Sequence, residues 1–376
     1  MLPGPEYTPT KGRCPSMTTP SPLLSRPGAV EGGGADAGVA AHYGEPLREQ
    51  RALAAGTAVV DLSHRGVVTV SGPDRLTWLN TLSSQQVTGL QPGESSELLL
   101  LSVQGRIEFD ARVVDDGGTT WLVVEAAEAG PLAEWLNRMK FMLRVEINDV
   151  SADWAVLGTT KDVPEWSGLL AWHDPWPQIG AGGYSYAVVP EDRHPGLERP
   201  WVEYLVPAAE LEQTVGDRPL AGVLAAEALR IAAWRPRLGA ETDDKTIPHE
   251  LDLLRTAVHL AKGCYKGQET IARVHNLGHP PRRLVFLQLD GSQHTMPAPG
   301  SQVLLGERKV GTVTSVAQHY EMGPVALAVI KRSVAPDEIL TVLDGEEPYT
   351  AAQEVIVAPD AGQVVGRPTG FLRGTR

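Results

Sequence analysis

The spacing of apolar residues changes along the chain, and each change marks a different predicted structure. Over residues 222–234 apolar residues recur every three to four positions, which predicts a helix with one apolar face. Over residues 98–124 apolar and polar positions alternate in three runs, which are separated by turn residues at 104–105 and 115–118. Alternation of period two between such turns predicts three antiparallel strands.

This pattern predicts an α+β fold with three structural domains. The first α+β domain spans residues 44–150 and combines the three strands with a strand at 67–70 and helices at 47–55, 74–82 and 131–143. The second α+β domain spans residues 151–281. Its strands are expected near Trp154, Tyr184 and Trp201, with a long surface loop at 161–183 and helices that begin at Pro207 and Gly222.

After Arg283 the chain consists of short β-rich runs divided by turn residues, and we expect a C-terminal β-barrel over residues 282–360. The two ends are predicted to lack stable structure. Seven prolines and seven glycines occur in the first 40 residues, so residues 1–43 are expected to be a disordered tail. We expect residues 361–376 to be flexible.

Composition narrows the class of protein. The net charge of −13 argues against loose binding to DNA, and no apolar run is long enough to span a membrane. With no visible secretory signal and no heptad pattern, we expect a cytoplasmic monomer. Residues 230–283 nevertheless hold ten Lys/Arg against six Asp/Glu. This local positive charge suggests a site for an anionic ligand, although a solvated surface is the ordinary explanation.

The segment Lys262-Gly263-Cys264-Tyr265-Lys266-Gly267-Gln268-Glu269 carries the second of the two cysteines; the other is Cys14. A buried, inert thiol is the ordinary state of a free cysteine. The flanking glycines and lysines favour a different interpretation, since lysines at this spacing can stabilise a thiolate or bind an anion. We expect a turn at a domain junction, between helices at 250–260 and 269–274.

Three further clusters are candidates for ligand contact. Arg230 falls beside the apolar face of its predicted helix, so it needs a partner or a ligand. Asp61, Ser63 and His64 are too close in sequence to form a hydrolase triad, and Asp61 and Ser63 are expected to bond local backbone in a turn, with ligand contact from His64 or Arg65 left open. Alternation places Asp110 on the opposite strand face from Ile107 and Phe109, and its carboxylate is a candidate to face a central cavity.

Four stretches resemble one superfamily. KGCYKGQETIARVHNLGHPPRRL at 262–284 is similar to the signature of the YgfZ family, folate-binding relatives of the glycine-cleavage T-protein. Weaker similarity lies in DLSHRG at 61–66 with VSGPDRLTWLN at 70–80, in GRIEFD at 105–110, and in AAEALRIAAWRPRLGAETDDKTIPHE at 225–250.

The resemblance implies a three-domain ring of glycine-cleavage T-protein type that binds tetrahydrofolate at its centre. It implies a role in assembly or repair of iron–sulfur clusters in client enzymes, with Cys264 as the functional thiol. The alternative is folate-dependent aminomethyl transfer, in which Asp110 would be the catalytic carboxylate; the T-protein branch has paired aspartates where this chain has Phe109-Asp110. A third hypothesis is a scaffold that uses folate only for stability. The residues expected to bind the cofactor are Arg230, Arg237, Glu241, Lys262, Tyr265, Lys266, Gln268, Glu269 and Arg273.

Overall fold

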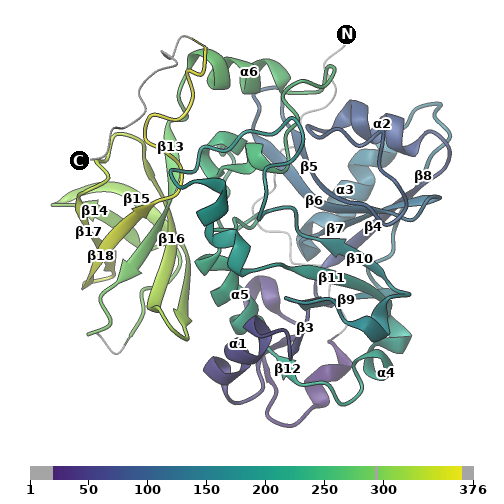
Figure 1. Ribbon diagram of the computed structural model, residues 1–376, viewed down its shortest axis with the longest axis horizontal. Coiled ribbons are helices and arrows are strands. Elements are labelled where there is room, and N and C mark those ends of the chain that lie inside the picture. Colours follow the sequence, from purple (N-terminus) through teal and green to yellow (C-terminus); the bar gives the residue numbers. More distant parts are fainter. Residues whose placement is uncertain (1–19, 293–294, 366–376) are drawn as a thin grey trace.

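The computed structural model describes residues 20–292 and 295–365, which form two α+β domains and a β-barrel (Figure 1). The first domain has an antiparallel sheet of order β5-β6-β7-β4-β8. Apolar side chains from this sheet pack against two helices, so that Phe109, Leu98 and Leu132 lie in one core. Its elements are β4 (Gly66–Ser71), α2 (Arg75–Leu82), β5 (Ser95–Leu101), β6 (Ile107–Asp115), β7 (Thr119–Val124), α3 (Ala126–Met139) and β8 (Glu146–Asp149).

The second domain has a five-stranded sheet of order β10-β11-β9-β3-β12. All neighbours in it are antiparallel except β3 and β12. Helices α1 and α5 pack together, and α5 contributes to the core the apolar face that the sequence predicted for it. Its elements are α1 (Pro46–Ala54), β3 (Val59–Asp61), β9 (Trp154–Thr159), β10 (Leu170–His173), β11 (Val202–Pro207), α4 (Leu211–Val215), β12 (Leu220–Ala221) and α5 (Val223–Ala232).

Two expectations about this domain were wrong. Residues 44–61 were assigned to the first domain, but α1 packs on α5 and β3 pairs with β9, so this segment belongs with the second sheet. Residues 161–183 were assigned to a loop, but β10 lies within them and pairs with β11. The side chain of Trp172 explains why this segment is a strand: its ring is buried in the core of the domain, whereas a surface loop would leave it exposed.

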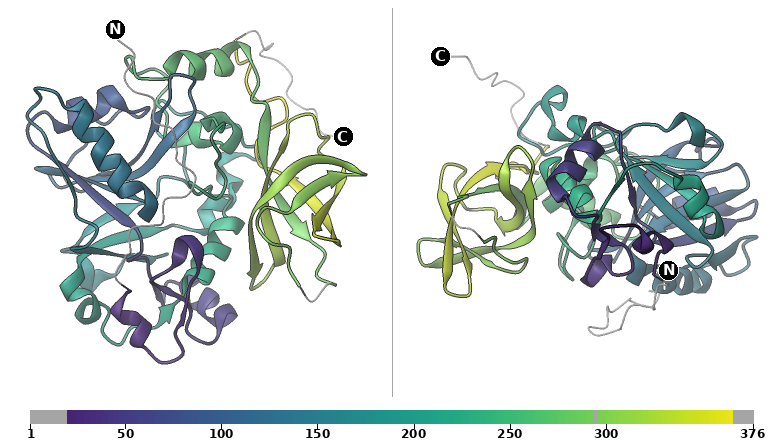
Figure 2. Two further views of the ribbon diagram at one scale, coloured as in Figure 1. Left: turned by 180° about the vertical axis from the view of Figure 1, so that it is seen from behind. Right: turned by 90° about the horizontal axis from the view of Figure 1, so that it is seen from below.

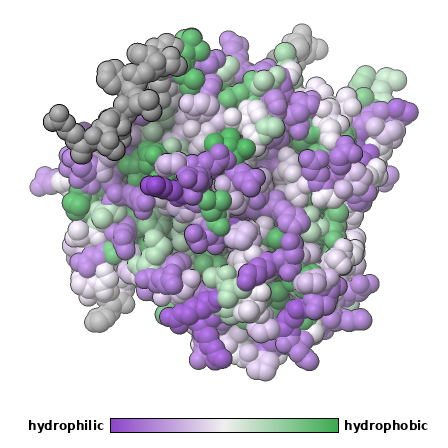
Figure 3. Space-filling model, in the orientation of Figure 1, coloured by the Kyte–Doolittle hydropathy of each residue, from purple (hydrophilic) through white to green (hydrophobic). Residues whose placement is uncertain are grey.

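The C-terminal barrel is confirmed as a closed sheet of order β13-β16-β15-β14-β17-β18, and Figure 2 shows it standing beside the two α+β domains. Alternate residues such as Leu340 and Val342 are buried inside it, while Ile339 is exposed. Its strands are β13 (Arg282–Leu289), β14 (Gln302–Leu305), β15 (Arg308–His319), β16 (Gly323–Lys331), β17 (Ile339–Asp344) and β18 (Glu347–Val355). The face of the molecule in Figure 3 is mostly polar, with small apolar patches.

The expectation of a disordered tail over residues 1–43 was wrong for residues 20–43. These residues form η1 (Pro22–Ser25), β1 (Val30–Glu31), η2 (Gly34–Asp36) and β2 (Ala40–His42). Leu23 and Val39 are fully buried, and their burial offsets the conformational cost of the glycines. Residues 1–19, with Cys14, lie outside the described residues. The expectation of a flexible tail over residues 361–376 was wrong for residues 361–364, since Ala361 is buried and Val364 N–H donates to the carbonyl of His275, and residues 366–376 lie outside the described residues.

Short helical turns complete the described chain. The helix expected at 250–260 is replaced by two 3₁₀ turns, because Asp252 between them has a left-handed backbone with φ of 59°. Among the described residues, no helix is both long and apolar enough to cross a membrane. The remaining elements are η3 (Pro164–Trp166), η4 (Glu191–Arg193), η5 (Pro195–Glu198), η6 (Ala208–Glu210), η7 (Pro248–Leu251), η8 (Leu253–Arg255) and α6 (Gln268–Leu277).

Candidate functional site

A cavity in the middle of the molecule is lined by arginines and carboxylates drawn from both α+β domains. Charged groups are costly to bury unless they are paired, so a cluster of this kind marks either a structural network or a ligand site. The arginines of the cavity are Arg65, Arg112, Arg199, Arg230, Arg235 and Arg237. Its carboxylates include Asp36, Asp174 and Glu203, and an adjoining smaller cavity, which shares Arg112, Arg235 and Arg237 with it, is lined by the carboxyls of Glu97, Asp110 and Glu125.

Asp110 lines the smaller of these two cavities and has a raised pKa. The alternation predicted for β6 is confirmed, because Ile107 and Phe109 are buried in the core while Asp110 lies on the other face. Glu97 on the neighbouring strand β5 lies close by. Burial, with the negative charge of Glu97, raises the pKa of Asp110 to about 8. Asp110 therefore carries a proton at neutral pH and can donate it within the cavity.

Glu97, beside Asp110, accepts hydrogen bonds from a guanidinium group and from a hydroxyl group. Its Oε1 accepts a hydrogen bond from Arg235 Nη2 at 2.7 Å, and its Oε2 accepts one from the Thr256 hydroxyl. Arg235 Nε also donates to Asp174 at 3.3 Å. Glu97 is thus ion-paired with Arg235, whereas its neighbour Asp110 has a raised pKa.

Six buried polar atoms in this region have no hydrogen-bond partner among the described residues. Two of them are Nη1 of Arg235 and Oε2 of Glu203, and the others are both ring nitrogens of His64 and the Nε atoms of Arg65 and Arg199. Glu203 Oε1 accepts from Trp201 Nε1 at 2.9 Å, and Arg112 Nε lies 3.3 Å from Oε2 without forming a well-directed bond. The side chains of Arg235 and Glu203 are both more than nine-tenths buried. Unpartnered buried donors and acceptors are costly, so a ligand with complementary groups would satisfy them.

The free space between these groups is small. It measures about 20 Å³, which suffices for one water molecule. Part of the volume is taken by Asp36, from η2 of the N-terminal segment. Its Oδ1 lies 2.8 Å from Arg237 Nη2 and 3.2 Å from His64 Nε2. The N-terminal segment therefore closes one side of the cavity.

The turn predicted at 61–66 is confirmed and places two of its residues in the cavity. Asp61 Oδ1 accepts from the Ser63 N–H at 2.9 Å, as expected for a local turn. His64 and Arg65, for which ligand contact was left open, both line the cavity. Arg65 Nη1 lies 3.3 Å from Glu125.

Arg230 and Glu241, both expected to bind the cofactor, are joined in a buried ion pair. Arg230 Nη1 donates to Glu241 Oε2 at 3.0 Å, and Nη2 donates to Ser315 at 2.7 Å. Glu241 Oε1 also accepts from Thr314 at 2.9 Å. These bonds connect α5 to strand β15 of the barrel. Glu241 thus connects the second α+β domain to the barrel. The Arg230 side chain also lines the cavity, where its N–H donors are already bonded to Glu241, Ser315 and other groups.

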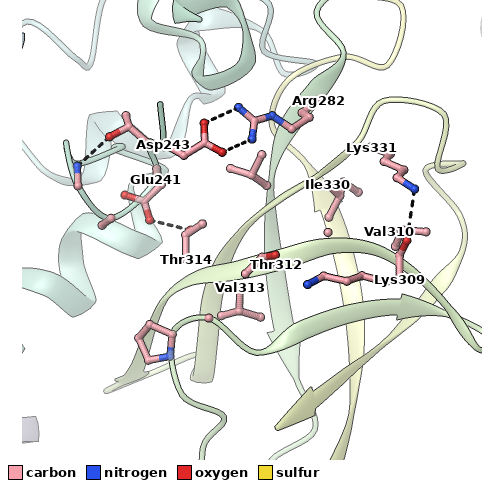
Figure 4. Close-up of a pocket in the computed structure, with 17 residues that line it drawn as sticks. Glu241, Asp243, Arg282, Lys309, Val310, Thr312, Val313, Thr314, Ile330 and Lys331 are labelled. Atoms are coloured by element: carbon pink, nitrogen blue, oxygen red, sulfur yellow. Dashed lines mark hydrogen bonds and ion pairs between the residues drawn. The ribbon is translucent and has the colours of Figure 1, made fainter. Parts of the chain in front are cut away.

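A separate, open groove lies between residues 239–243 and the barrel strands β15 and β16 (Figure 4). Its volume is about 720 Å³. Arg282 Nη1 pairs with Asp243 at 2.6 Å on one wall, and Lys331 Nζ donates to the Lys309 carbonyl at 3.5 Å on the other. The groove is wide and exposed, whereas the central cavity is narrow and buried.

The motif around Cys264 is a loop anchored to the first domain, with the thiol exposed. The Lys262 ammonium donates to the backbone carbonyls of Asn80, Ser83 and Gln85 at 2.6, 2.7 and 2.7 Å. Burial lowers the pKa of Lys262 to about 8, while three carbonyl acceptors favour its charged form. Lys262, expected to stabilise a thiolate or to bind an anion, thus has its ammonium group bonded to the end of α2 and the turn after it.

The other residues of the motif are also placed by the structure. Lys266 Nζ pairs with Glu108 at 3.3 Å, and Gln268 Nε2 donates to the Lys262 carbonyl at 3.2 Å. Tyr265 is buried, whereas Glu269 and Arg273 are exposed on α6. None of the described cavity-lining residues comes from 262–273. The structure therefore separates the predicted cofactor residues into two groups, one at the cavity and one at the loop.

Gly267 explains why this loop carries glycine. Its φ is +87°, and a Cβ there would lie 2.6 Å from the carbonyl oxygen of Ser102. No other residue allows this close approach to the hairpin between β5 and β6. Gly263, by contrast, has open space around it. The loop is thus fixed at both ends, by Lys262 and by Gly267, and leaves Cys264 at the surface.

Several cavity residues were not predicted. They share a sequence signal that was available: a single charged residue within an otherwise apolar strand. Glu97 precedes four consecutive leucines, and Glu203 stands in the run Trp201-Val202-Glu203-Tyr204-Leu205. Asp36 and Asp174 carry no such signal, because they lie in irregular segments.

Two protein-family models match parts of this chain. The model of the GCVT N-terminal domain matches residues 38–160, and that of the glycine cleavage T-protein C-terminal barrel domain matches residues 282–357. An aminomethyltransferase of Nostoc sp. is 29% identical over 316 residues, covering 77% of this chain and 80% of that protein. A chloroplastic protein of Arabidopsis thaliana named as a transferase is 26% identical over 324 residues, covering 79% and 72%.

A solved structure supports the architecture. The glycine cleavage system aminomethyltransferase T from Bartonella henselae superposes with a TM-score of 0.70 over 91% of this chain and 96% of that chain. The sequence identity of this pair is 18%, so the likeness concerns the fold. The expected architecture of two α+β domains and a barrel is confirmed.

Proposed function

Because the chain belongs to the glycine-cleavage T-protein superfamily, we propose that it binds a tetrahydrofolate in the central cavity and transfers a one-carbon unit there. One observation carries the proposal: Asp110, a carboxyl with a raised pKa, lies beside Glu97, which is ion-paired with Arg235, in a small cavity lined by arginines. A carboxyl whose pKa is raised towards neutral is suited to general acid–base chemistry.

The polar groups of the cavity suit such a ligand. A pterin ring presents amino and amide N–H donors, for which the unpartnered Oε2 of Glu203 is an acceptor. The glutamate tail of the cofactor is anionic and suits the arginines, of which Arg235 has an unpartnered Nη1. The limited space means that the ligand can enter only if part of the lining moves.

Bound tetrahydrofolate would supply the nitrogen atoms that carry the one-carbon unit. In this proposal Asp110 holds a proton at its carboxyl and exchanges it with the bound substrate. Burial and the negative charge of Glu97 keep that proton on Asp110, and Arg235 holds the Glu97 carboxylate in place through a hydrogen bond of 2.7 Å. The burial of Glu97 and Arg235 limits the access of water to these groups and strengthens their electrostatic interactions.

The test separates binding from chemistry. Calorimetry should show binding of tetrahydrofolate to the wild type and to Asp110→Asn with dissociation constants within about threefold of each other. The rate of methylene-tetrahydrofolate formation from an aminomethyl-lipoyl carrier protein should fall about 10²–10⁴-fold in Asp110→Asn, the usual contribution of an acid–base group. Glu346→Gln, an exposed carboxylate in a barrel turn, is the matched control. No product with the wild type would refute the transferase, and no binding would refute the folate site.

A second candidate function is support of iron–sulfur enzymes through Cys264. The observation in its favour is an exposed thiol on a loop that is anchored at both ends, which would present sulfur to another protein. The test is deletion of the gene in its host, followed by assays of aconitase and of a radical-SAM enzyme. Rescue by the wild type and not by Cys264→Ala would support this function, whereas unchanged enzyme activities after deletion would refute it.

A further inference from the structure

The N-terminal segment reaches the central cavity through one side chain. Gly33, Gly34, Ala35 and Ala37 are exposed, while Asp36 between them is partly buried with 22% of its side chain accessible. Its Oδ1 contacts Arg237 Nη2 at 2.8 Å and His64 Nε2 at 3.2 Å. A carboxylate is therefore held inside the cavity by a segment that otherwise lies in solvent.

The chain on either side of Asp36 is rich in glycine. Gly34 and Gly38 have positive φ angles of 64° and 91°, and Gly33 has nothing near the position of a Cβ. Glycine permits large backbone changes at low cost. Beyond the tip the segment is firmly attached, because Gly32 N–H donates to the Val39 carbonyl at 2.8 Å and Val39 is fully buried. The tip at 33–37 can therefore swing while its base stays in place.

Electrostatics favours the closed arrangement when no ligand is present. Burial raises the pKa of Asp36, but its hydrogen bonds and charge interactions with His64 and Arg237 outweigh burial and hold the pKa well below its usual range. Arg237 also pairs with Glu125 at 2.7 Å, so it keeps a partner when Asp36 leaves. Opening the tip thus exposes a guanidinium that remains in position for another carboxylate.

We propose that residues 33–37 form a gate in which the Asp36 carboxylate occupies, at Arg237 and His64, the place of a carboxylate group of an anionic ligand. The inference rests on the proposed function in one respect, that the ligand is a reduced folate with an anionic glutamate tail. The free space of about 20 Å³ cannot hold a fused bicyclic ring, so the ligand must displace part of the lining. The tip is the part that combines a glycine-rich backbone with a single charged contact.

The first experiment measures access to Arg237 without any folate. Wild type, Asp36→Ala, Asp36→Asn and the control Glu346→Gln are treated with phenylglyoxal, and modification of Arg237 is followed by peptide mass spectrometry. Arg237 is 7% exposed, so slow modification is expected in the wild type and in the control. Asp36→Ala should be modified at least about fivefold faster, with Asp36→Asn in between. Equal rates in all four proteins would overturn the gate.

The second experiment measures tetrahydrofolate affinity of the same proteins by calorimetry. If only molecules with an open gate bind the ligand, the apparent affinity is the affinity of the open state multiplied by the fraction of open molecules. Asp36→Ala should therefore bind tetrahydrofolate about 3–10-fold more tightly than the wild type. Binding with unchanged affinity would overturn the gate and leave the folate site intact. Faster modification of Arg237 with no binding by any variant would overturn the folate site and support the gate.

Denaturant unfolding tests whether Arg237 becomes reactive in the Asp36 variants only because these proteins are less stable. Asp36→Asn retains the shape and the acceptor of the side chain and loses only its charge, so it should be less stable than the control but fully folded in the absence of denaturant. If Asp36→Ala unfolds much more readily, the comparison of Asp36→Asn with Glu346→Gln decides the question, and equal Arg237 reactivity in these two proteins would overturn the gate.

Discussion

Replacement of Asp110 by asparagine tests the electrostatics of the cavity without any ligand. The pKa of Asp110 is raised to about 8, whereas in the unfolded chain an aspartate has a pKa of about 3.9. Between these two pH values the native state retains a proton that the unfolded chain has lost. The native state therefore binds more protons, and its stability falls as pH rises from about 4 to about 8.

The magnitude follows from linkage. One pKa unit corresponds to about 1.4 kcal/mol. Between pH 5 and pH 7 the raised pKa of Asp110 therefore lowers the free energy of unfolding of the wild type by at most about 2.7 kcal/mol, and the asparagine variant avoids this loss. Asp110 interacts with Glu97 and is only partly shielded from solvent, which reduces the effect. We expect the Asp110→Asn variant to gain about 1–2 kcal/mol on the wild type over this interval.

Urea unfolding followed by tryptophan fluorescence at pH 5, 6, 7 and 8 measures the difference. The advantage of Asp110→Asn should widen steadily up to pH 8 and stay constant above it. Glu346→Gln should follow the wild type at every pH. Parallel stability profiles for Asp110→Asn and the wild type would show that Asp110 titrates normally in the folded protein, and the acid–base proposal would lose its physical basis.

Three further substitutions test the framework around the two sites. Gly267→Ala should lower the unfolding free energy by about 1–3 kcal/mol, because of its positive φ and the contact with Ser102, whereas Gly263→Ala should change it by less than about 0.5 kcal/mol in the same urea titration. Glu241→Gln should cost about 3 kcal/mol by leaving Arg230 underpaired, and a wild-type midpoint in calorimetry would contradict this. Lys262→Met should cost about 1–3 kcal/mol and speed alkylation of the nearby thiol, since three carbonyls lose their donor; unchanged alkylation kinetics would show that the anchor is dispensable.

Local signals in the sequence were sufficient for most of the secondary structure and for the barrel. The alternation in β6 correctly placed Asp110 on the face opposite Phe109, because side-chain direction in a strand depends only on parity. The apolar face of α5 likewise identified Arg230 as a buried charge that needs a partner. These are properties of neighbouring residues, which the sequence by itself determined.

Tertiary structure decided which distant charges share a cavity. Asp36 meets Arg237 across 201 positions, and Arg235 meets Glu97 across 138, distances over which sequence pattern carries no information. The same holds for Lys262, whose ammonium faces carbonyls of α2 and its following turn rather than the neighbouring Cys264. A charge in the chain is visible from sequence, but its partner is selected by packing, because the cost of burial is relieved only by the groups that the fold brings within hydrogen-bonding distance.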